Sequence, residues 1–282
     1  MTGSLAGIED WLRPRREALD RWLRERMSGE WPASFEQALL HPLGGGKAIR
    51  PAIVWAACEA VGGDPDGEAA MTVAASVELV HTYSLVHDDL PCMDDDALRR
   101  GRPTVHVAHG EAAAVLVGDA LLTEAFGVLA ETPVATETRV EMIWLLARAA
   151  GLRGMVGGQA ADIGMAGPIE TEQALLHVHE TKTGALMEAC AMLGGTAGGG
   201  EDVEIGALAF WGRAVGLAFQ LADDLLDACR DVGRPSFVSL LGADATKQRA
   251  EEAVARAMDM ARELPRHERL DQLARFAVER TR

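Results

Sequence analysis

Two clusters of aspartates are the features of this chain whose residue types and spacing could do chemistry. The first lies within residues 88–96 and the second within residues 223–227. Carboxylates packed this densely repel one another unless cations lie between them, and oxygen-only ligand sets are those that Mg²⁺ prefers. The sequence therefore predicts a site that binds Mg²⁺ together with a diphosphate.

Helical periodicity separates the members of the second cluster. Asp223 and Asp227 are four positions apart and lie on one face of a helix, whereas Asp224 lies about 100° away around the helix axis. We therefore expect Asp223 and Asp227 to share one site.

The first cluster needs a break in its helix. Asp88 and Asp94 are six positions apart and would point to different faces of an ideal helix. Pro91 lies between them, and a proline that distorts or ends the helix could bring Asp94 round to the same metal. Alternatively, residues 94–96 form a solvated helix terminus. Two clusters flanked by apolar helix favour function, because burying unpaired carboxylates is costly.

Helices are the elements that must position these clusters. Long stretches rich in Ala, Leu, Glu and Arg are separated by Gly and Pro, which favours helix over strand. No stretch has the alternation of a strand, and the chain has no low-complexity linker and no obvious repeat, so we predict a single all-α domain over residues 1–282. Breaks are expected near residues 44–46, 62–67, 101–103, 132–133, 167–168, 194–200, 233–235 and 264–265.

Composition narrows the class of protein. A chain of 282 residues with 48% hydrophobic residues can bury a large core, and a formal net charge of −16 argues against a nucleic-acid partner. The four cysteines have neither disulfide nor zinc spacing and are expected to be reduced. The N-terminus lacks the pattern of a signal peptide, and no uncharged apolar stretch reaches about 18 residues. We therefore expect a cytoplasmic protein without a membrane span.

Basic residues gather beside the motifs in this acidic protein. Lys47 and Arg50 follow a run of glycines, and Arg99 and Arg100 come shortly after the first aspartate cluster. Surface solubility is the usual role of Lys and Arg. Two arginines so soon after three aspartates are an unusual place for charges that have no function.

Six ordered motifs cover almost the whole chain. They are residues 45–51, 81–91, 98–104, 157–159, 182–186 and 219–224. Together they resemble the trans-isoprenyl diphosphate synthases, particularly the bacterial farnesyl and geranylgeranyl diphosphate synthases. The resemblance implies an all-α helical bundle around a central cavity, with an aspartate-rich motif on each of two facing helices. It also implies a homodimer.

The implied reaction is the Mg²⁺-dependent head-to-tail (1′-4) condensation of isopentenyl diphosphate with an allylic diphosphate, either dimethylallyl or geranyl diphosphate. By resemblance, three Mg²⁺ ions neutralise the leaving diphosphate. Asp88 and Asp94 hold them on one side and Asp223 on the other. Asp89 and Asp227 assist as nearer or outer ligands.

The resemblance also assigns residues to the two substrates. Lys182 and Arg99 add positive charge to the allylic diphosphate, while Thr183 and Gln220 face the allylic cation. Isopentenyl diphosphate lacks the metal ions and needs direct cationic and hydrogen-bond donors. The residues assigned to it are Lys47, Arg50, His81 and Arg100.

By resemblance to the family, product length depends on the residue five positions before the first aspartate. Here it is Tyr83, the only tyrosine in the chain, and a bulky ring at this position would stop the growing product. Together with the two-residue expansion Pro91 and Cys92, Tyr83 predicts a fifteen-carbon product, farnesyl diphosphate. The alternative is that Tyr83 is an ordinary core residue.

One departure from the family pattern follows Asp227. Roughly a dozen loop residues are missing compared with the family, and Gly233 and Arg234 align with a later Gly-Lys pair. The loop lysine that contacts the allylic diphosphate in the family therefore has no counterpart, and a weaker grip on that diphosphate is expected.

Three alternatives to a farnesyl diphosphate synthase stay open. A geranylgeranyl diphosphate synthase would differ in product length alone. A class I terpene cyclase-like enzyme would share the metal-triggered ionisation, but the presence of Lys47, Arg50 and His81 disfavours it. A non-catalytic partner subunit of a prenyl synthase would usually have lost aspartates, and this chain keeps them.

Overall fold

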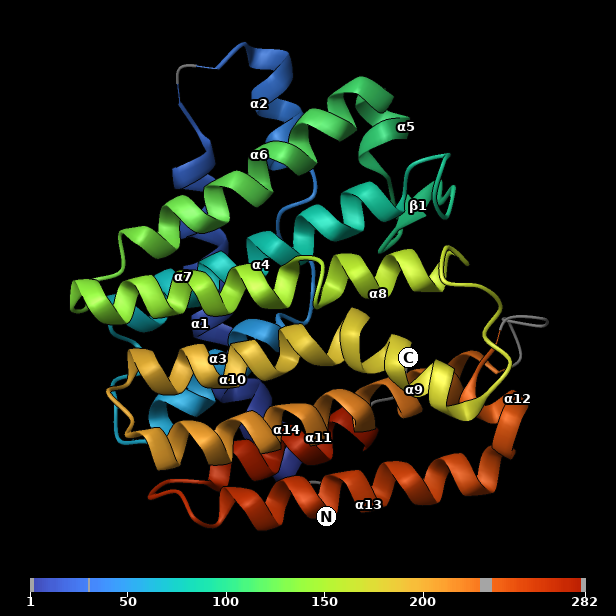
Figure 1. Ribbon diagram of the computed structural model, residues 1–282. Coiled ribbons are helices and arrows are strands. Elements are labelled where there is room, and N and C mark those ends of the chain that lie inside the picture. Colours follow the sequence, from blue (N-terminus) through green and yellow to red (C-terminus); the bar gives the residue numbers. More distant parts are fainter. Residues whose placement is uncertain (1–2, 30, 229–234, 280–282) are drawn as a thin grey trace.

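Helices make up most of the structure, a computed structural model that describes residues 3–29, 31–228 and 235–279 (Figure 1). The predicted all-α class is confirmed. The helices are α1 (Gly3–Met27), α2 (Ala33–Leu40), α3 (Ile49–Ala60), α4 (Glu68–Asp88), α5 (Val105–His109), α6 (Glu111–Ala130), α7 (Thr136–Ala150), α8 (Met155–Asp162), α9 (Glu172–His179), the π-helical turn η1 (Glu180–Gly184), α10 (Ala185–Ala197), α11 (Asp202–Asp227), α12 (Phe237–Leu241), α13 (Ala243–Ala261) and α14 (Glu268–Glu279).

A short hairpin is the exception that the sequence did not predict. Strand β1 (Leu98–Arg99) pairs antiparallel with β2 (Arg102–Pro103). Arg100 and Gly101 between them have φ angles of 54° and 74°, and two successive positive φ angles make the tight turn that joins antiparallel strands. Strands of two residues are too short to show an alternating pattern in the sequence.

The long helices lie side by side, with α10 near the centre of the bundle. It packs against α3, α7 and α11, while α11 packs against α13 and α4 packs against α6 (Figure 1). At Gly194 of α10, an added Cβ would lie 2.3 Å from the carbonyl oxygen of Val54 in α3. Only glycine allows this close approach of two helix backbones. The predicted break at residues 194–200 therefore begins later, after Ala197.

The two helices that carry the aspartate clusters are largely buried. In α4 the buried residues extend around most of the helix, from Ala70 to Val86, which is typical of a helix at the centre of a bundle. In α11 they extend from Ala207 to Ala222. Each aspartate cluster thus lies at the C-terminal end of a core helix, and both ends lie on the same side of the bundle (Figure 1).

Three helices among the described residues are long and apolar enough to cross a membrane by length and composition alone. They are α4, α6 and α11, whose most apolar windows are 67%, 39% and 56% buried inside the protein. Length and composition therefore do not support the predicted absence of a membrane span, and that absence stays a prediction.

Candidate active site

The C-terminal ends of α4 and α11 form the framework of the site. The last carbonyl groups of a helix carry a partial negative charge, and both ends also carry aspartates. Negative charge is therefore concentrated at one side of the bundle, where cations would be strongly favoured.

A tight turn brings the two ends of the first aspartate cluster together. The backbone N–H of Asp94 donates to the carbonyl oxygen of Asp88 at 2.8 Å, and the N–H of Asp95 donates to that of Leu90 at 3.1 Å. Asp95 has a φ of 55°, a left-handed conformation that Asp tolerates. The chain thus returns Asp94 to the end of α4, as the position of Pro91 suggested.

Asp88 lies in a half-buried position that disfavours its charge. Burial raises its pKa to about 6, and Asp94 and Asp89 add to the increase, while Lys182 opposes it. Its Oδ1 accepts a hydrogen bond of 3.0 Å from Nε2 of Gln159 in α8. Burial and the neighbouring negative charges both disfavour the ionised carboxylate of Asp88, and a bound cation would stabilise it.

Asp89 accepts hydrogen bonds from Arg99 of the hairpin. Only 4% of its surface is exposed, and Nε of Arg99 donates to its Oδ1 at 2.9 Å. Arg99 also donates to Oδ2 of Asp96 at 2.8 Å. The structure therefore places the Arg99 guanidinium, which we expected at the allylic diphosphate, against two aspartates, because a buried carboxylate is stable only with a paired donor.

The π-helical turn η1 lies opposite the first cluster. A π turn is rare and often marks a functional site. Here it carries Lys182, whose Nζ lies 2.6 Å from Oδ2 of Asp162, and Thr183, whose hydroxyl donates to Oε1 of Gln220 at 3.2 Å. The turn therefore connects α8 with α11, and it brings Thr183 and Gln220 together.

The second cluster divides as its periodicity predicts. Asp224 accepts a hydrogen bond of 2.7 Å from the backbone N–H of Phe237 and one of 3.4 Å from Nε2 of Gln220. It thereby holds the first turn of α12 against α11. Asp223 lies on another face. Burial lowers the pKa of the Arg50 guanidinium, and Asp223 lies near enough to oppose this decrease.

The glycine-rich turn before α3 forms a pocket with the hairpin. Nη1 of Arg100 donates to the carbonyl oxygen of Gly44 at 2.9 Å, while Lys47 is exposed in the same turn. A hollow of about 100 Å³ lies here. Its wall includes Gly44, Gly45, Thr82, Asp89, Arg99 and Arg100.

His81 and Arg50 lie deeper beneath this turn, each half-buried. Burial lowers the pKa of His81 well below its ordinary value, and Arg50, Arg100 and Arg99 lower it further. His81 is therefore neutral near pH 7 and can both donate and accept a hydrogen bond. Glu78, one turn before His81 on α4, is a charged neighbour that the sequence analysis missed. A lone glutamate within an apolar helix was its only signal.

Tyr83 lies inside the bundle. Only 5% of its surface is exposed, and its ring meets that of His87 edge-on at 5.8 Å between centroids. Burial raises the pKa of Tyr83 to about 12, with a further increase from Asp88. His87 itself packs so closely on Gly118 of α6 that a Cβ there would overlap its ring. The role of Tyr83 in product length stays a prediction.

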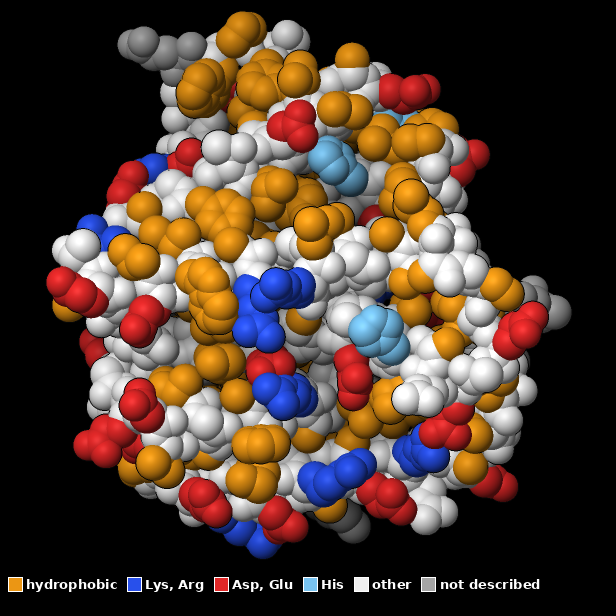
Figure 2. All heavy atoms as spheres, viewed as in Figure 1, with side chains coloured by type: hydrophobic (Ala, Val, Ile, Leu, Met, Phe, Trp, Pro, Cys, Tyr) orange, Lys and Arg blue, Asp and Glu red, His pale blue; other side chains and the backbone are white. Residues whose placement is uncertain are grey.

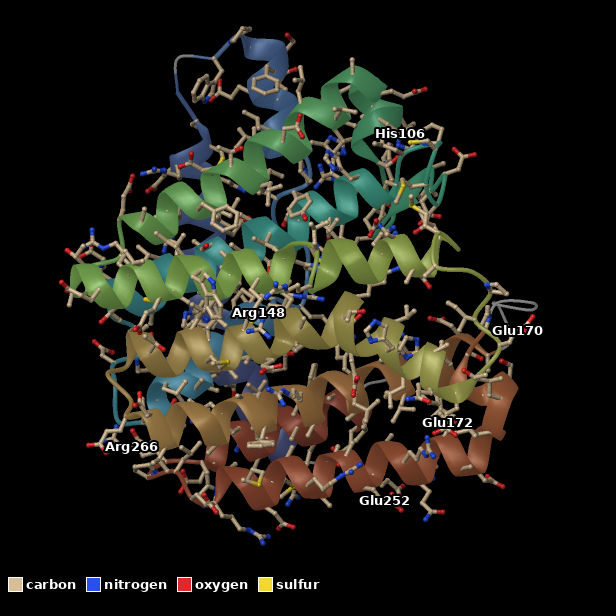
Figure 3. The ribbon with its side chains drawn as sticks, in the orientation of Figure 1. His106, Arg148, Glu170, Glu172, Glu252 and Arg266 are labelled. Carbon is tan, nitrogen blue, oxygen red and sulfur yellow. The ribbon has the colours of Figure 1, made fainter. Side chains whose placement is uncertain are left out.

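A second, wider hollow lies apart from the two aspartate clusters. It measures about 930 Å³ and lies between α7, α10, α11 and α13. Figure 2 shows basic side chains beside hydrophobic ones on this face, and Figure 3 shows Arg148 over the boundary between α7 and α10. Thr181 and Gly184 of η1 line one of its walls. None of the predicted site residues does.

The donor set fits Mg²⁺. No group of three or more His, Cys, Asp or Glu side chains converges on one point within residues 3–29, 31–228 and 235–279. Proteins usually bind Mg²⁺ through one or two carboxylates, with waters and substrate phosphates as the other ligands. Half-buried Asp88 with the returning Asp94 provides such carboxylates, and Asp223 with Asp227 provides others. Gly233 and Arg234, on which the shortened loop was inferred, lie outside the described residues.

A family model described as polyprenyl synthetase matches residues 32–275 of the chain. The chain belongs to the polyprenyl synthetase family. This family comprises prenyltransferases, and the curated relatives are named as prenyl diphosphate synthases. The close resemblance noted in the sequence is confirmed.

Three relatives of the chain include both farnesyl and geranylgeranyl synthases by name. The farnesyl diphosphate synthase of Geobacillus stearothermophilus is 39% identical over 86% of the chain and 82% of its own length. The heterodimeric geranylgeranyl pyrophosphate synthase large subunit 2 of Arabidopsis thaliana is 37% identical over 86% of the chain and 68% of its own. The chain spans 58% of another plant synthase, geranylgeranyl pyrophosphate synthase 4.

A solved structure supports the same fold. The apo FPP/GFPP synthase from Zymomonas mobilis is 36% identical to this polyprenyl synthetase and superposes with a TM-score of 0.90. The match covers 97% of this chain and 99% of that one. The terpenoid-synthase-like bundle predicted from the motifs is therefore the observed architecture.

Proposed function

We propose that the chain is a short-chain trans-prenyl diphosphate synthase that condenses isopentenyl diphosphate with dimethylallyl or geranyl diphosphate. The observation that carries the proposal is the pair of aspartate clusters at the ends of α4 and α11, next to a cationic pocket. One continuous hydrophobic core extends from Ile8 to Ala277, which supports a single domain over residues 1–282.

The residues around the aspartate clusters and those of the cationic pocket would have separate roles. When bound, Mg²⁺ supplies the positive charge that stabilises the leaving diphosphate. Asp88, Asp94 and Asp223 would hold it, with Asp89 and Asp227 as helpers. Lys182 would add charge to the allylic diphosphate after leaving Asp162, its partner at 2.6 Å.

Charge also develops on the allylic carbon as its C–O bond breaks and the electrons leave with the diphosphate. Thr183 donates to Oε1 of Gln220, so lone pairs of both oxygens stay available to face that cation. The electrons of the terminal double bond of isopentenyl diphosphate then form the new C–C bond. The carbon next to the resulting cation loses a proton to the released diphosphate, and the double bond re-forms there. Lys47, Arg50, His81 and Arg100 would hold the diphosphate of the isopentenyl substrate during this step.

We propose farnesyl diphosphate as the product because Tyr83 is buried on α4 more than one helical turn before Asp88. Relatives named as geranylgeranyl pyrophosphate synthases favour the twenty-carbon product as the second candidate. A relative named as the large subunit of a heterodimer keeps the partner-subunit alternative relevant.

Incubation with both substrates tests the proposal. The purified chain with Mg²⁺, dimethylallyl or geranyl diphosphate and isopentenyl diphosphate is expected to release a fifteen-carbon prenyl diphosphate. Chromatographic sizing of the products distinguishes it from a twenty-carbon product. Omitting isopentenyl diphosphate provides the control, because a cyclase would consume the allylic substrate alone. A chain that elongates neither substrate contradicts the proposal.

We also propose that the chain forms a homodimer through the outer face of α6 and α7. Leu116 of α6 is 56% exposed, and Val140 and Trp144 of α7 are 61% and 59% exposed. The two helices pack against each other, and exposed apolar side chains gathered on neighbouring helices are typical of an association site. Sedimentation is expected to give twice the mass of one chain. Leu116→Lys should shift the protein toward one chain, and a wild-type protein that sediments as a single chain would contradict the dimer.

A further inference from the structure

Glu78 is a half-buried glutamate to which the proposed reaction gives no role. It lies on α4 one turn before His81 and so on nearly the same helix face. By the rise of an α-helix, about 1.5 Å per residue, it is about 4.5 Å farther from the aspartates at the end of α4. Glu78 therefore lies at the inner end of the pocket proposed for isopentenyl diphosphate.

Two polar atoms face this inner end without a partner. Within the described residues, Oε2 of Glu78 and Nε of Arg50 are both buried and make no hydrogen bond. Arg50 belongs to the first turn of α3, which packs between α4 and α10. An unpaired buried donor and acceptor are costly, and a movement of the Arg50 guanidinium that pairs its Nε with the Glu78 carboxylate would satisfy both atoms.

The charges around Arg50 single out Glu78. The groups that favour its guanidinium charge are Cys190 of α10, Glu78 and Asp223, while Arg100 opposes it. The Cys190 thiol is neutral because burial raises its pKa to about 12. Asp223 is assigned to the metal. Glu78 is therefore the carboxylate that remains to balance the Arg50 guanidinium when both substrates are bound.

We propose that Glu78 is a positioning residue for isopentenyl diphosphate: its carboxylate orients the Arg50 guanidinium so that the outer N–H groups meet the diphosphate. This inference rests on the proposed function. A guanidinium has five N–H donors in a rigid fork, so one side can bind a carboxylate while the other binds a phosphate. Glu78 itself does not touch the substrate.

Substrate-specific kinetics test this role. Glu78→Gln keeps the shape and removes the charge, and we expect the KM for isopentenyl diphosphate to rise about tenfold or more, the effect of losing one charge-assisted hydrogen bond. The KM for the allylic diphosphate should not change. Glu78→Asp keeps the charge and should recover part of the affinity. Calorimetry with inorganic diphosphate and no Mg²⁺ should show weaker binding by Glu78→Gln as well.

Glu59 provides a matched control. It is another half-buried glutamate whose buried Oε2 has no hydrogen-bond partner in the described part of the chain, but it lies near Arg269, on the side of α3 toward α14. Glu59→Gln should leave both KM values unchanged. Thermal unfolding of each variant separates lost affinity from lost folding. Where Glu78→Gln is too unstable to purify, Glu78→Asp carries the same comparison.

A double-mutant cycle decides whether Glu78 acts through Arg50. Arg50→Lys should raise the KM for isopentenyl diphosphate in the wild-type chain but add little to Glu78→Gln, because coupled residues are not additive. Lys47→Ala, in the exposed turn, should raise that KM by the same factor in both backgrounds. If the wild type elongates substrates and Glu78→Gln behaves as Glu59→Gln does, or binds isopentenyl diphosphate more tightly, the positioning role is wrong while the proposed function stands.

Discussion

Asp223→Ala is expected to lower the rate of condensation by at least about 10²- to 10³-fold, because electrostatic stabilisation of the leaving group is usually the largest catalytic contribution. Asp223 lies at the end of α11, across from Asp88 at the end of α4, and the two would hold different Mg²⁺ ions around one diphosphate. Asp88→Ala should have an effect of similar size. Steady-state rates at saturating Mg²⁺ measure both.

The helical fold should survive these changes. Burial and like charge already raise the pKa of Asp88, so removing the carboxylate relieves repulsion in the metal-free protein. Circular dichroism should therefore be unchanged. Asp202→Ala, an exposed position at the opposite end of α11, is the matched control and should keep its rate. Near-normal turnover by Asp223→Ala at saturating Mg²⁺ would rule out the proposed metal ligands.

Tyr83→Ala is expected to change the product to longer prenyl chains. The residue lies five positions before Asp88, about 7.5 Å deeper by the helical rise, and its ring is 95% buried against His87 and the core. Removing the ring opens space in line with a chain that grows away from the metal site. Chromatography of the products after extended incubation measures the shift.

Stability limits how this experiment is designed. Replacing a buried aromatic by Ala typically costs about 3–5 kcal/mol, and it also removes the edge-on partner of His87. Tyr83→Leu fills part of the space and provides a second test if Tyr83→Ala unfolds. Tyr83→Phe keeps the ring and should keep the product length. Products that stop at the wild-type length in both Tyr83→Ala and Tyr83→Leu would mean that another residue ends the cavity.

The sequence by itself determined the helices and the candidate ligands. The four-residue spacing of Asp223 and Asp227 separates them from Asp224, and the structure indeed uses Asp224 to hold the N–H of Phe237. Pro91 indicated that the chain bends after Asp88, and Asp94 does return to it. These features depend on backbone geometry within a few residues, which periodicity and proline chemistry describe well.

Tertiary structure alone decided which charges meet. Arg99 binds Asp89 and Asp96, and Lys182 binds Asp162. Asp89 lies ten positions before Arg99 and Asp162 lies twenty positions before Lys182, so the periodicity of a single helix does not connect these partners. A half-buried charge takes whichever opposite charge the packing of the helices brings within reach, because leaving it unpaired costs more than any local preference provides.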